Sequence, residues 1–576
     1  MQAIVSRSVF VSVIATLSLL TWAEGGAAPP APAPAPSAAK RDAVSVRLPG
    51  AAFAAMQTIN PEHIRWHVRY LSLDLLEGRG TGQRGGDIAA EYIATQFAED
   101  GLKPAGDNGS FLQKVPLVGI TTLPETQFSL VPKQGQGQSP AMTLKPLEDY
   151  VAYDQTQQPQ SDIDAEIVYV GYGIEAPEYN WDDYKGVDVR GKVLLMLVNE
   201  PPSDDPKFFK GKALTYYGRW TYKYEEAARK GAAGVILIHK EDMASYPWEV
   251  VRNSNSGEKS YLKLEGPVLK VASWVQLDVA KKLAAASGMD LDKMMADART
   301  REFHPVNLGA KLKAHMVSNV RHFESNNVVA ILPGSDRKLK DEAVIYTAHY
   351  DHLGIRPDMP GDNIYNGAAD NATGCGILLE LARAFSVAKD RPARSIIFSA
   401  VTAEEQGLLG SEYLGKHPPV PAGKIALDLN YDDVQPIGSP EEAEVSGAER
   451  TTFYPWVQAM AKEFRLAIRP DARPEAGHFY RSDHFSLARV GIPSFSINEG
   501  MKFKGHDEAW GLAQDKEYTE KHYHQPSDEY HPEMDFIGDA AMARFGFALG
   551  WEAASFTRLI GWQKGDEFEA ARLKSQ

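Results

Sequence analysis

Two kinds of hydrophobic pattern alternate along this chain. Short and nearly continuous apolar runs, such as AVIYTAH and SIIFSAV, are typical of strands that are buried on both faces of a sheet. Longer segments such as DIAAEYIATQFAEDGLKP carry apolar residues four positions apart, for example Ile93 and Phe97, and this spacing indicates an amphipathic helix. Because runs and helical segments follow one another, the pattern predicts an α/β protein.

The second half of the chain shows this alternation most clearly. From about residue 325, strands are predicted for NVVAILPG, AVIYTAH, SIIFSAV, IALDLNYDD and GIPSFSI. Helices are predicted between them for GCGILLELARAFSVA and WVQAMAKEFRLA, and MDFIGDAAMARFGFALGWEAASFTRL predicts a long helix that packs on the sheet. The expected fold is therefore a mostly parallel mixed sheet flanked by helices.

The middle of the chain has a different character. Residues 142–318 contain the short β runs EIVYVGYGIEAP, KVLLMLVNE and GVILIHK, and the helical segment KYEEAARKGAAG ends in glycine before the last of them. This pattern predicts a smaller β-rich α/β domain. The larger domain would then be built from residues 45–141 and 319–576, with the smaller one inserted between them.

The N-terminus carries the pattern of a targeting signal. Arg7 precedes the apolar run VFVSVIATLSLLTWA, which predicts a signal peptide over residues 1–23 and a protein that is periplasmic or secreted. An uncleaved anchor is the alternative, but a run of about 15 residues is short for a spanning helix. Residues 24–44 are rich in proline and alanine and predict an extended linker.

Composition narrows the possible partners and ligands. The chain has 61 basic and 76 acidic side chains and a net charge of −15, which argues against nucleic acid and anionic membranes as partners. Cys375 is the single cysteine, so neither an intramolecular disulfide nor a multi-cysteine zinc site can form. His, Asp and Glu therefore remain as the possible metal ligands.

Potential metal ligands follow several of the predicted strands. In open α/β sheets, ligands and catalytic groups collect at the carboxyl ends of strands. Taken singly, such residues have ordinary explanations as helix caps or turns. Taken together, carboxylates packed at one sheet edge would repel each other unless a cation held them. The potential ligands and their neighbours at these positions are His349, Asp351 and His352; Asp370 and Asn371; Glu404 and Glu405; Asp432 and Asp433; and His524 with Asp528.

This set of residue types suits zinc or a similar divalent ion, because it combines imidazoles with carboxylates and no thiol. Five ligands exceed what one tetrahedral ion with an open position can use. With one carboxylate bridging, they fit two metal ions roughly 3.5–4 Å apart. Glu404 and Glu405 are adjacent in the chain. One of the two would bind metal, and the other, which faces the cleft, would accept a proton from water.

The motifs resemble those of a known family. TAHYDHLG, GAADNATG, TAEEQGLLGS, LDLNYDD and YHQPSDE occur in the order and approximate spacing of the co-catalytic dizinc metallopeptidases, which include bacterial secreted aminopeptidases, aminopeptidase Y and glutamate carboxypeptidase. RSDHFSLARVGIPSFSI is similar to the family's SDH…GIP segment, and YVGYGIEAPEYNWDDYKGVDVRGKVLLM resembles its inserted protease-associated (PA) domain. The resemblance covers the mature chain and implies a zinc-peptidase/phosphorylase-like fold.

The resemblance also implies a ligand set for two zinc ions per chain. Three neighbouring aspartates, Asp428, Asp432 and Asp433, could supply one of these ligands. Asp432 is preferred, because Asn430-Tyr431-Asp432 fits the family's N-x-D pattern best. By this comparison, the ligands would be His349 and Asp432 for one ion, Glu405 and His524 for the other, and Asp370 as the bridge.

Further roles follow from the same resemblance. Glu404 would be the general base in peptide-bond hydrolysis, and Asp351 would hold the ring of His349 in the right tautomer. Tyr480 or His478 would help to polarise the scissile carbonyl or stabilise its oxyanion.

The implied activity is that of an aminopeptidase acting on peptide substrates. The fold also hosts glutamate-type carboxypeptidases, dipeptidases and glutaminyl cyclases, so it does not decide the substrate. A carboxypeptidase would need arginines in the cleft, for which Arg481 and Arg489 are the local candidates. A binding module on the same scaffold is the non-enzymatic alternative, but such relatives have lost metal ligands that this chain retains.

Overall fold

The structure is a computed structural model. The predicted signal peptide (1–23) and linker (24–44) lie outside the residues that it describes. The described residues are 46–132, 140–263, 266–357, 359–471 and 473–576.

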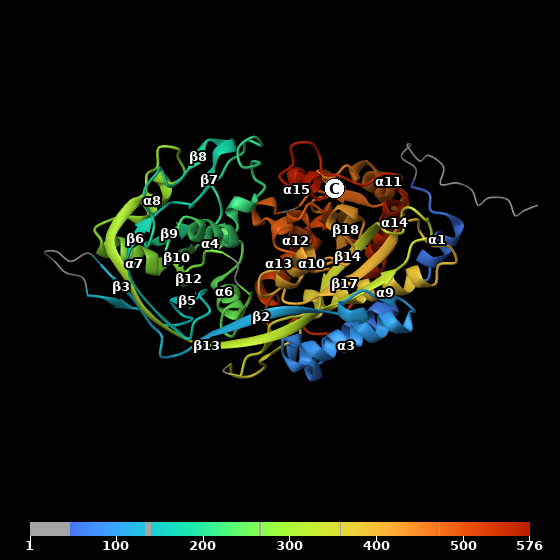
Figure 1. The fold of residues 1–576 in the computed structure, drawn as a ribbon, viewed down its shortest axis with the longest axis horizontal. Helices are drawn as coiled ribbons and strands as arrows, with labels where there is room; N and C mark the ends of the chain where they lie inside the picture. Colours follow the sequence, from blue (N-terminus) through green and yellow to red (C-terminus); the bar gives the residue numbers. More distant parts are fainter. Residues whose placement is uncertain (1–45, 133–139, 264–265, 358, 472) are drawn as a thin grey trace, which may run out of the picture. The chain divides into compact units, whose positions relative to one another are not determined.

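A mixed sheet forms the centre of the larger domain (Figure 1). Its first four strands are mutually parallel, and two further strands continue the sheet with antiparallel pairings. The predicted mostly parallel mixed sheet flanked by helices is confirmed. In spatial order the strands are β21 (Ser494–Ser496), β18 (Ile425–Asn430), β14 (Ala343–His349), β17 (Ser395–Val401), β13 (Val306–Leu332) and β2 (Leu112–Thr122).

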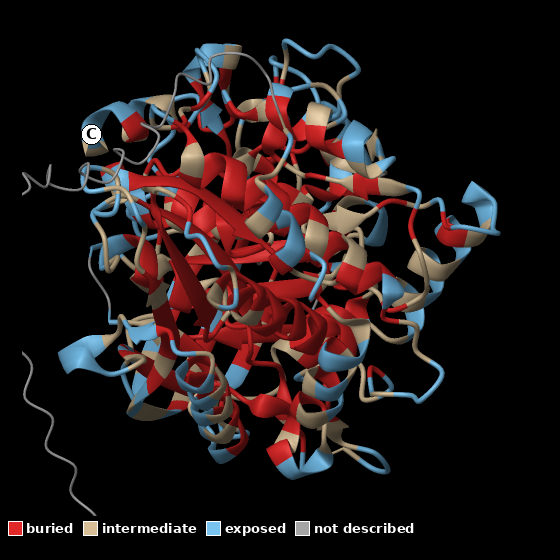
Figure 2. Ribbon diagram, turned by 90° about the vertical axis from the view of Figure 1, so that its right-hand side faces the viewer, coloured by how far each residue is buried: buried red, intermediate tan, exposed pale blue. Residues whose placement is uncertain are grey.

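Helices cover both faces of this sheet, which explains why its strands are apolar at nearly every position. Every residue of β14 and of β17 is buried. Figure 2 shows the strands at the centre of the molecule in red, the colour of buried residues. Tyr346 and Phe398 face one side and pack against Phe385, whereas Ile345 and Ile397 face the other. The first face is covered by α2 (Pro61–Leu71), α3 (Arg84–Glu99), α9 (Thr373–Ser386) and α14 (Ile537–Ser555), and the second by α10 (Leu409–Lys416) and α12 (His484–Arg489).

The predicted C-terminal helix is α14, and its glycines let it approach the sheet closely. The hydroxyl of Tyr346 donates a hydrogen bond to the carbonyl oxygen of Gly546 at 2.9 Å. A Cβ atom at Gly546 would lie 1.7 Å from Tyr431 Oη, and one at Gly550 would lie 1.8 Å from Tyr346 Oη. Glycine is therefore required at both positions by the packing of strand tyrosines against the helix.

The strands of the middle region continue the same sheet beyond β13 and have their own buried core. Four of its strands are parallel, and β5 closes the far edge in the antiparallel direction. The same region contains four helices: α4 (Trp220–Arg229), α6 (Trp248–Ser254), α7 (Leu277–Ala286) and α8 (Leu291–Asp297). The strands are β6 (Gln160–Tyr169), β9 (Val193–Leu197), β10 (Gly234–His239), β12 (Val271–Gln276) and β5 (Tyr150–Tyr153).

Strand β13 joins the two parts of this sheet. Its first part pairs with β6 and with β3 (Gln127–Val131), and its last part pairs with β2 and β17. The expected domain boundary between residues 318 and 319 therefore falls inside one continuous strand. Strand β11 (Lys259–Leu262), within the expected insertion, also pairs with β2.

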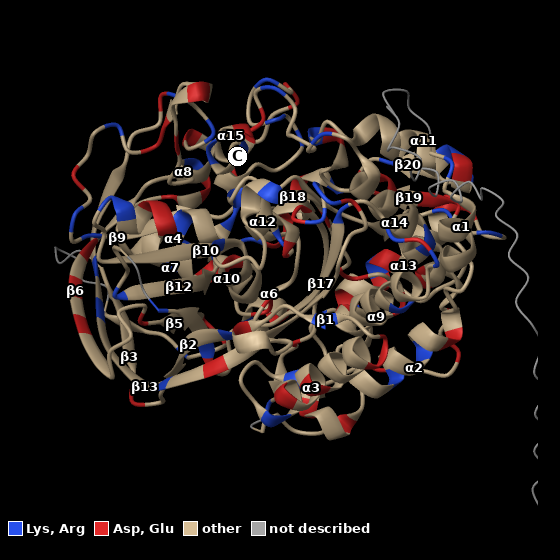
Figure 3. Cartoon of the chain, turned by 45° about the vertical axis from the view of Figure 1, so that its right-hand side comes forward, with Lys and Arg blue, Asp and Glu red and all other residues tan. Residues whose placement is uncertain are grey.

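Charged residues of both signs are interspersed over the helices and loops in the view of Figure 3. Among the helices of the described residues, none combines the length and the apolar character that crossing a membrane requires.

Candidate metal centre and active site

The parallel strands bring their carboxyl ends to one edge of the sheet. His349, the last residue of β14, is level with Val401, the last residue of β17, and Asn430 ends β18 beside Thr347. The chain segments that leave these strands therefore start side by side. Glu404 and the acidic pair after Asn430 follow within a few residues, which is why they meet.

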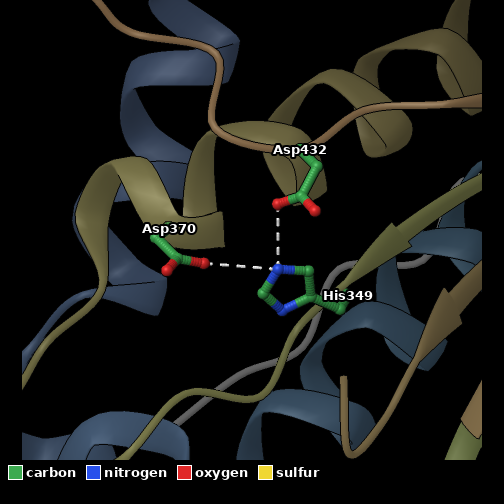
Figure 4. A group of neighbouring side chains, drawn as sticks. All are labelled: His349, Asp370 and Asp432. Carbon is green, nitrogen blue, oxygen red and sulfur yellow. Dashed lines mark hydrogen bonds and ion pairs between the residues drawn. The ribbon is translucent and has the colours of Figure 1, made fainter. Parts of the chain in front are cut away.

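His349, Asp370 and Asp432 form the first group of potential ligands (Figure 4). His349 Nε2 lies 3.0 Å from Asp432 Oδ1 and 3.3 Å from Asp370 Oδ1. His349 and Asp370 are buried, whereas the side chain of Asp432 is partly exposed at 14%. One imidazole nitrogen thus faces two carboxylate oxygens, an arrangement that could hold a metal ion.

The second carboxylate oxygen of Asp370 faces a different group. Asp370 Oδ2 lies 3.2 Å from His524 Nε2, and the same nitrogen lies 3.1 Å from Glu405 Oε2. Asp370 therefore stands between two sets of ligands, one on each of its oxygens, as the sequence comparison expects of a bridging carboxylate. The other oxygen of Glu405 lies 2.6 Å from Nδ1 of the buried His352.

The electrostatics of the cluster fit a bound cation. Burial alone lowers the pKa of His524, but the carboxylates of Glu405 and Asp370 outweigh burial and raise it to about 10. Burial also raises the pKa of Glu404, and the neighbouring carboxylates of Asp432 and Glu405 raise it further. Carboxylates in such number at a buried site require positive charge, and these imidazole and carboxylate donors could hold two divalent ions.

A strained turn places the adjacent glutamates. After β17, Ala403 adopts a positive φ of 56°, a conformation that L residues other than glycine and asparagine seldom adopt. The backbone N–H of Glu404 donates to Asp351 Oδ1 at 3.1 Å, and Thr81 Oγ1 donates to Asp351 Oδ2 at 3.0 Å. Asp351 thereby fixes the segment that carries Glu404 and Glu405.

This finding changes the role expected for Asp351. His349 Nδ1 lies 3.2 Å from the backbone carbonyl oxygen of Asp351 and 3.9 Å from its carboxylate. The carbonyl is therefore the nearer acceptor that fixes the histidine tautomer, because a proton on Nδ1 leaves Nε2 free to bind metal. The carboxylate instead supports the turn before Glu404.

Two further buried residues hold the loop around Asp370. Asp528 accepts hydrogen bonds from the backbone N–H groups of Ala369 at 2.9 Å and of Asp370 at 3.0 Å. Arg79, which is fully buried, donates to the carbonyl oxygens of Tyr350 and Gly367 on either side of the cluster. Sequence reasoning gave Arg79 no role, since its contacts depend entirely on the fold.

Two cavities adjoin the cluster, and Glu404 lines both. We call the first the acidic cavity: it is lined by His349, Asp370 and Asp432 and by Glu444, Asp471, Glu499 and Asp515. We call the second the aromatic cavity: it is lined by Glu405 and His524 and by Tyr153, Tyr216, Trp220, Tyr224 and Trp274. The general-base candidate thus stands where the two cavities meet.

The two residues expected to face the scissile carbonyl each line one of the cavities. Tyr480 lines the aromatic cavity, and its hydroxyl donates to Glu567 Oε1 at 2.6 Å. His478 does line the acidic cavity, with Nδ1 3.2 Å from Asp471 Oδ1. Tyr523 lines both cavities, and its adjacency to His524 was the signal in the sequence that could have identified it.

His352 is another residue without an assigned role in the sequence analysis. Its ring lies between Glu405 and Asp370, with Nδ1 3.9 Å from Asp370 Oδ2. Its position three residues after His349 was the available signal. The ligand candidates His349, Asp370, Glu405, Asp432 and His524 are all brought together by the fold.

The middle region also contributes to the cluster. Ser254, the last residue of α6, places Oγ 2.9 Å from His524 Nδ1. The neighbouring Asn253 donates to the backbone carbonyl oxygen of His524 at 3.2 Å. A ligand candidate from one end of the chain is therefore held by a helix from the region that the sequence predicted as a separate insertion.

Comparison with known proteins finds sequences that are similar to parts of this chain. The model of peptidase family M28 matches residues 327–545. A probable zinc metalloprotease of Pyricularia oryzae is 40% identical over 96 residues, which are 16% of this chain and 17% of that protein. A glutamate carboxypeptidase 2 homolog of Caenorhabditis briggsae is 24% identical over 414 residues, which are 58% of this chain and 48% of that protein.

The chain therefore matches less than half the length of these relatives. Among solved structures, an aminopeptidase from Aneurinibacillus sp. strain AM-1 aligns with a TM-score of 0.49 at 19% identity, over 87% of this chain and 95% of that one. A zinc aminopeptidase from Bacillus subtilis aligns with a TM-score of 0.44 at 17% identity, over 89% of this chain and 97% of that one.

Proposed function

We propose that this chain, whose residues 327–545 match the model of peptidase family M28, is a zinc-dependent exopeptidase that removes N-terminal residues from peptides. The observation that carries the proposal is the position of Asp370. Its two carboxylate oxygens face two separate histidines, His349 and His524, at 3.3 and 3.2 Å. This is the arrangement by which one carboxylate serves two metal ions.

The proposed ligands follow from these distances. His349 and Asp432 would hold one zinc ion, Glu405 and His524 would hold the other, and Asp370 would be shared. When bound, the zinc ions supply Lewis acidity and lower the pKa of water towards neutrality. The donor set fits zinc because it offers imidazole nitrogens and carboxylate oxygens in a buried site.

Glu404 is the proposed general base. It follows the turn at Ala403 and lines both cavities, so a substrate that spans the cluster passes its carboxylate. Glu404 would accept a proton from the attacking water and return it to the amine that leaves. Tyr523, which lines both cavities, would donate a hydrogen bond to the oxyanion, a role proposed here in place of Tyr480.

The acidic cavity favours an aminopeptidase. Glu444, Glu499 and Asp515 lie on its walls, and carboxylates near the cluster attract the positively charged amino terminus of a peptide. Arg473 forms an ion pair with Asp515 at 3.2 Å, which leaves Glu444 and Glu499 for this role. A glutamate-carboxypeptidase-like or dipeptidase activity is the second candidate, because arginines line the other cavity.

The middle region, residues 142–318, is proposed to be a PA domain that narrows access to the cluster. Its residues Tyr246 and Ser254 line the cavities, and Ser254 contacts His524 directly. The chain is further proposed to be exported to the periplasm or the medium, on the strength of the apolar run after Arg7. Sequencing the N-terminus of the mature protein tests this proposal.

Metal analysis and peptide hydrolysis on one preparation test the proposed function. We expect about two zinc ions per chain and release of p-nitroaniline from aminoacyl-p-nitroanilides. In Glu404→Ala the metal should remain, while turnover falls roughly 100- to 10,000-fold. Glu412→Gln, which alters a different glutamate of the aromatic cavity, is the control.

Other outcomes separate the alternatives. Two zinc ions without hydrolysis of any aminoacyl substrate would favour the carboxypeptidase or dipeptidase activity. Absence of bound metal would contradict the enzyme and leave a non-catalytic binding module.

A further inference from the structure

Three potential metal ligands that do not belong to the proposed zinc cluster meet in the acidic cavity. They are Glu444, Asp471 and His478, and we call them the Glu444 triad. Each offers one ligand atom, and these atoms all lie within 4.8 Å of one another. His478 Nδ1 lies 3.2 Å from Asp471 Oδ1, close to the 3.0 and 3.1 Å that separate imidazole nitrogens from carboxylate oxygens in the cluster. The triad therefore has the donor types and the spacing of a metal site.

A small sheet of three strands brings the triad together. In spatial order its strands are β20 (Ala467–Arg469), β19 (Glu442–Glu444) and β22 (Asn498–Glu499). Glu444 is the last residue of β19, and Asp471 follows shortly after β20, which runs parallel to β19. Because parallel strands bring their carboxyl ends to the same edge, these two carboxylates meet there. His478 comes from the next turn of the chain and contacts Asp471.

Asn498 adds a buried oxygen atom that lacks a partner. It stands directly opposite Glu444 in the antiparallel pair of β19 and β22, and it lines the same cavity. Side chains of directly opposite residues lie on the same face of a sheet. Asn498 Oδ1 is buried and has no hydrogen-bond partner among the described residues. Since buried amide oxygens are normally satisfied, this atom indicates a missing ligand beside Glu444.

The carboxylate of Glu444 also lacks a counter-ion. Burial, together with the carboxylates of Asp471 and Asp515, raises the pKa of Glu444 to about 8. Arg469 opposes this shift, but its guanidinium already forms an ion pair with Glu508 at 2.8 Å. A cation bound between the carboxylates of the triad would remove their repulsion and stabilise their charged forms.

The donor types indicate which cation fits. Ca²⁺ and Mg²⁺ prefer ligand sets made of oxygen atoms alone, whereas an imidazole suits zinc. The triad supplies three protein ligands and leaves a fourth position for Asn498 or water. All three side chains of the triad are partly exposed, whereas most ligands of the proposed cluster are buried. An ion in the triad should therefore exchange with the medium more readily than the ions of the cluster.

We propose that the Glu444 triad is a third zinc site, of lower affinity than the cluster, and that zinc bound there inhibits the enzyme. This inference rests on the proposed exopeptidase function, in which Glu444 attracts the amino terminus of the peptide. The triad and the cluster face one cavity of about 190 Å³. A cation at Glu444 neutralises the attracting carboxylate and repels the positive amino terminus, so excess zinc competes with the substrate.

Kinetics at increasing concentrations of free zinc test the proposal. Hydrolysis of leucine p-nitroanilide is measured with the zinc-loaded enzyme. We expect added zinc to raise KM and to leave kcat unchanged, because the ion and the amino terminus compete for one carboxylate. His478→Gln and Asp471→Asn each remove a ligand of the triad. In both variants the zinc concentration that gives half-inhibition should rise roughly 10-fold or more.

Two controls are matched to this experiment. Asp515 lines the same cavity but is paired with Arg473 and does not belong to the triad. Asp515→Asn should therefore be inhibited at a zinc concentration close to that of the wild type. Calcium ions should not inhibit at concentrations at which zinc does, because they do not favour an imidazole ligand. Equal inhibition by both ions would overturn the zinc site.

The results distinguish the inference from the function on which it rests. If excess zinc does not inhibit the wild type, or inhibits both triad variants equally well, the inference is overturned and the exopeptidase stands. If leucine p-nitroanilide is not hydrolysed, the proposed function fails, and equilibrium dialysis against zinc then decides the inference. One more zinc ion per chain in the wild type than in His478→Gln and Asp471→Asn supports it, and equal zinc content overturns it.

Discussion

Ser254 and His524 are 270 residues apart in the chain, yet Ser254 Oγ lies 2.9 Å from His524 Nδ1. With His524 Nε2 directed at Asp370 and Glu405, a proton on Nδ1 can be donated to the serine oxygen. This contact joins the middle region to the proposed metal cluster. Partners of this kind set the orientation of a ligating ring and its basicity.

Ser254→Ala should therefore weaken zinc binding. Loss of the acceptor leaves Nδ1 of His524 without its partner, and zinc affinity should fall roughly 10-fold or more. Competition with a chromophoric chelator measures the effect directly. Ser256→Ala is the control, because Ser256 Oγ donates to the carbonyl oxygen of Asn253 and does not reach His524. Equal zinc affinity in both variants would contradict a role for Ser254.

Asp370→Ala should reduce the zinc content more than any other single ligand change. Asp370 faces both histidines, whereas Asp432 faces only His349. We expect little zinc in Asp370→Ala and about one ion per chain in Asp432→Ala, as measured by mass spectrometry of metals after dialysis. If Asp370→Ala retained one tightly bound ion, the shared role of this carboxylate would be wrong.

Gly546→Ala should destabilise the larger domain. The added Cβ atom would lie 1.7 Å from Tyr431 Oη, so helix or strand must move. Overpacking of this kind costs about 1–3 kcal/mol and lowers the thermal midpoint. Gly561→Ala is the matched control, because its nearest atoms lie 3.9 Å away in contact that a methyl group can make. Similar midpoints for the two variants would contradict the packing argument.

His484 should make the protein sensitive to acid. Burial lowers the pKa of His484 from 6.5 to about 3, and the charge of Arg450 adds to the shift. The unfolded chain therefore binds a proton between pH 6.5 and about 3 that the folded chain does not. The contribution of His484 to the free energy of unfolding is therefore fully present above pH 6.5, and it is lost as the pH falls from 6.5 to about 3.

Thermal midpoints measured across that window test the prediction. His484→Gln should flatten the decline in stability with falling pH, whatever its effect at pH 7. His506→Gln is the control, because His506 is exposed. An unchanged slope in His484→Gln would show that other groups cause the acid sensitivity.

The sheet and most of the proposed ligands could be predicted from the amino-acid sequence. Strands β14 and β17 were predictable because each is apolar along its whole length and is buried on both faces. His349 and the pair Glu404 and Glu405 stand directly after these strands, so the parallel topology alone brings them to one edge. The long helix α14 was predictable for the same reason, since it must cover an apolar face.

Which side chains reach the cluster from other parts of the chain depends on the folded structure. Tyr480 lines the aromatic cavity, but its hydroxyl donates to Glu567, whereas Tyr523 lines both cavities. Nothing local in the sequence indicates that Ser254 meets His524. Hydrophobic periodicity specifies which face of an element is buried, whereas the direction and partners of a polar side chain depend on contacts between segments that are distant in the chain.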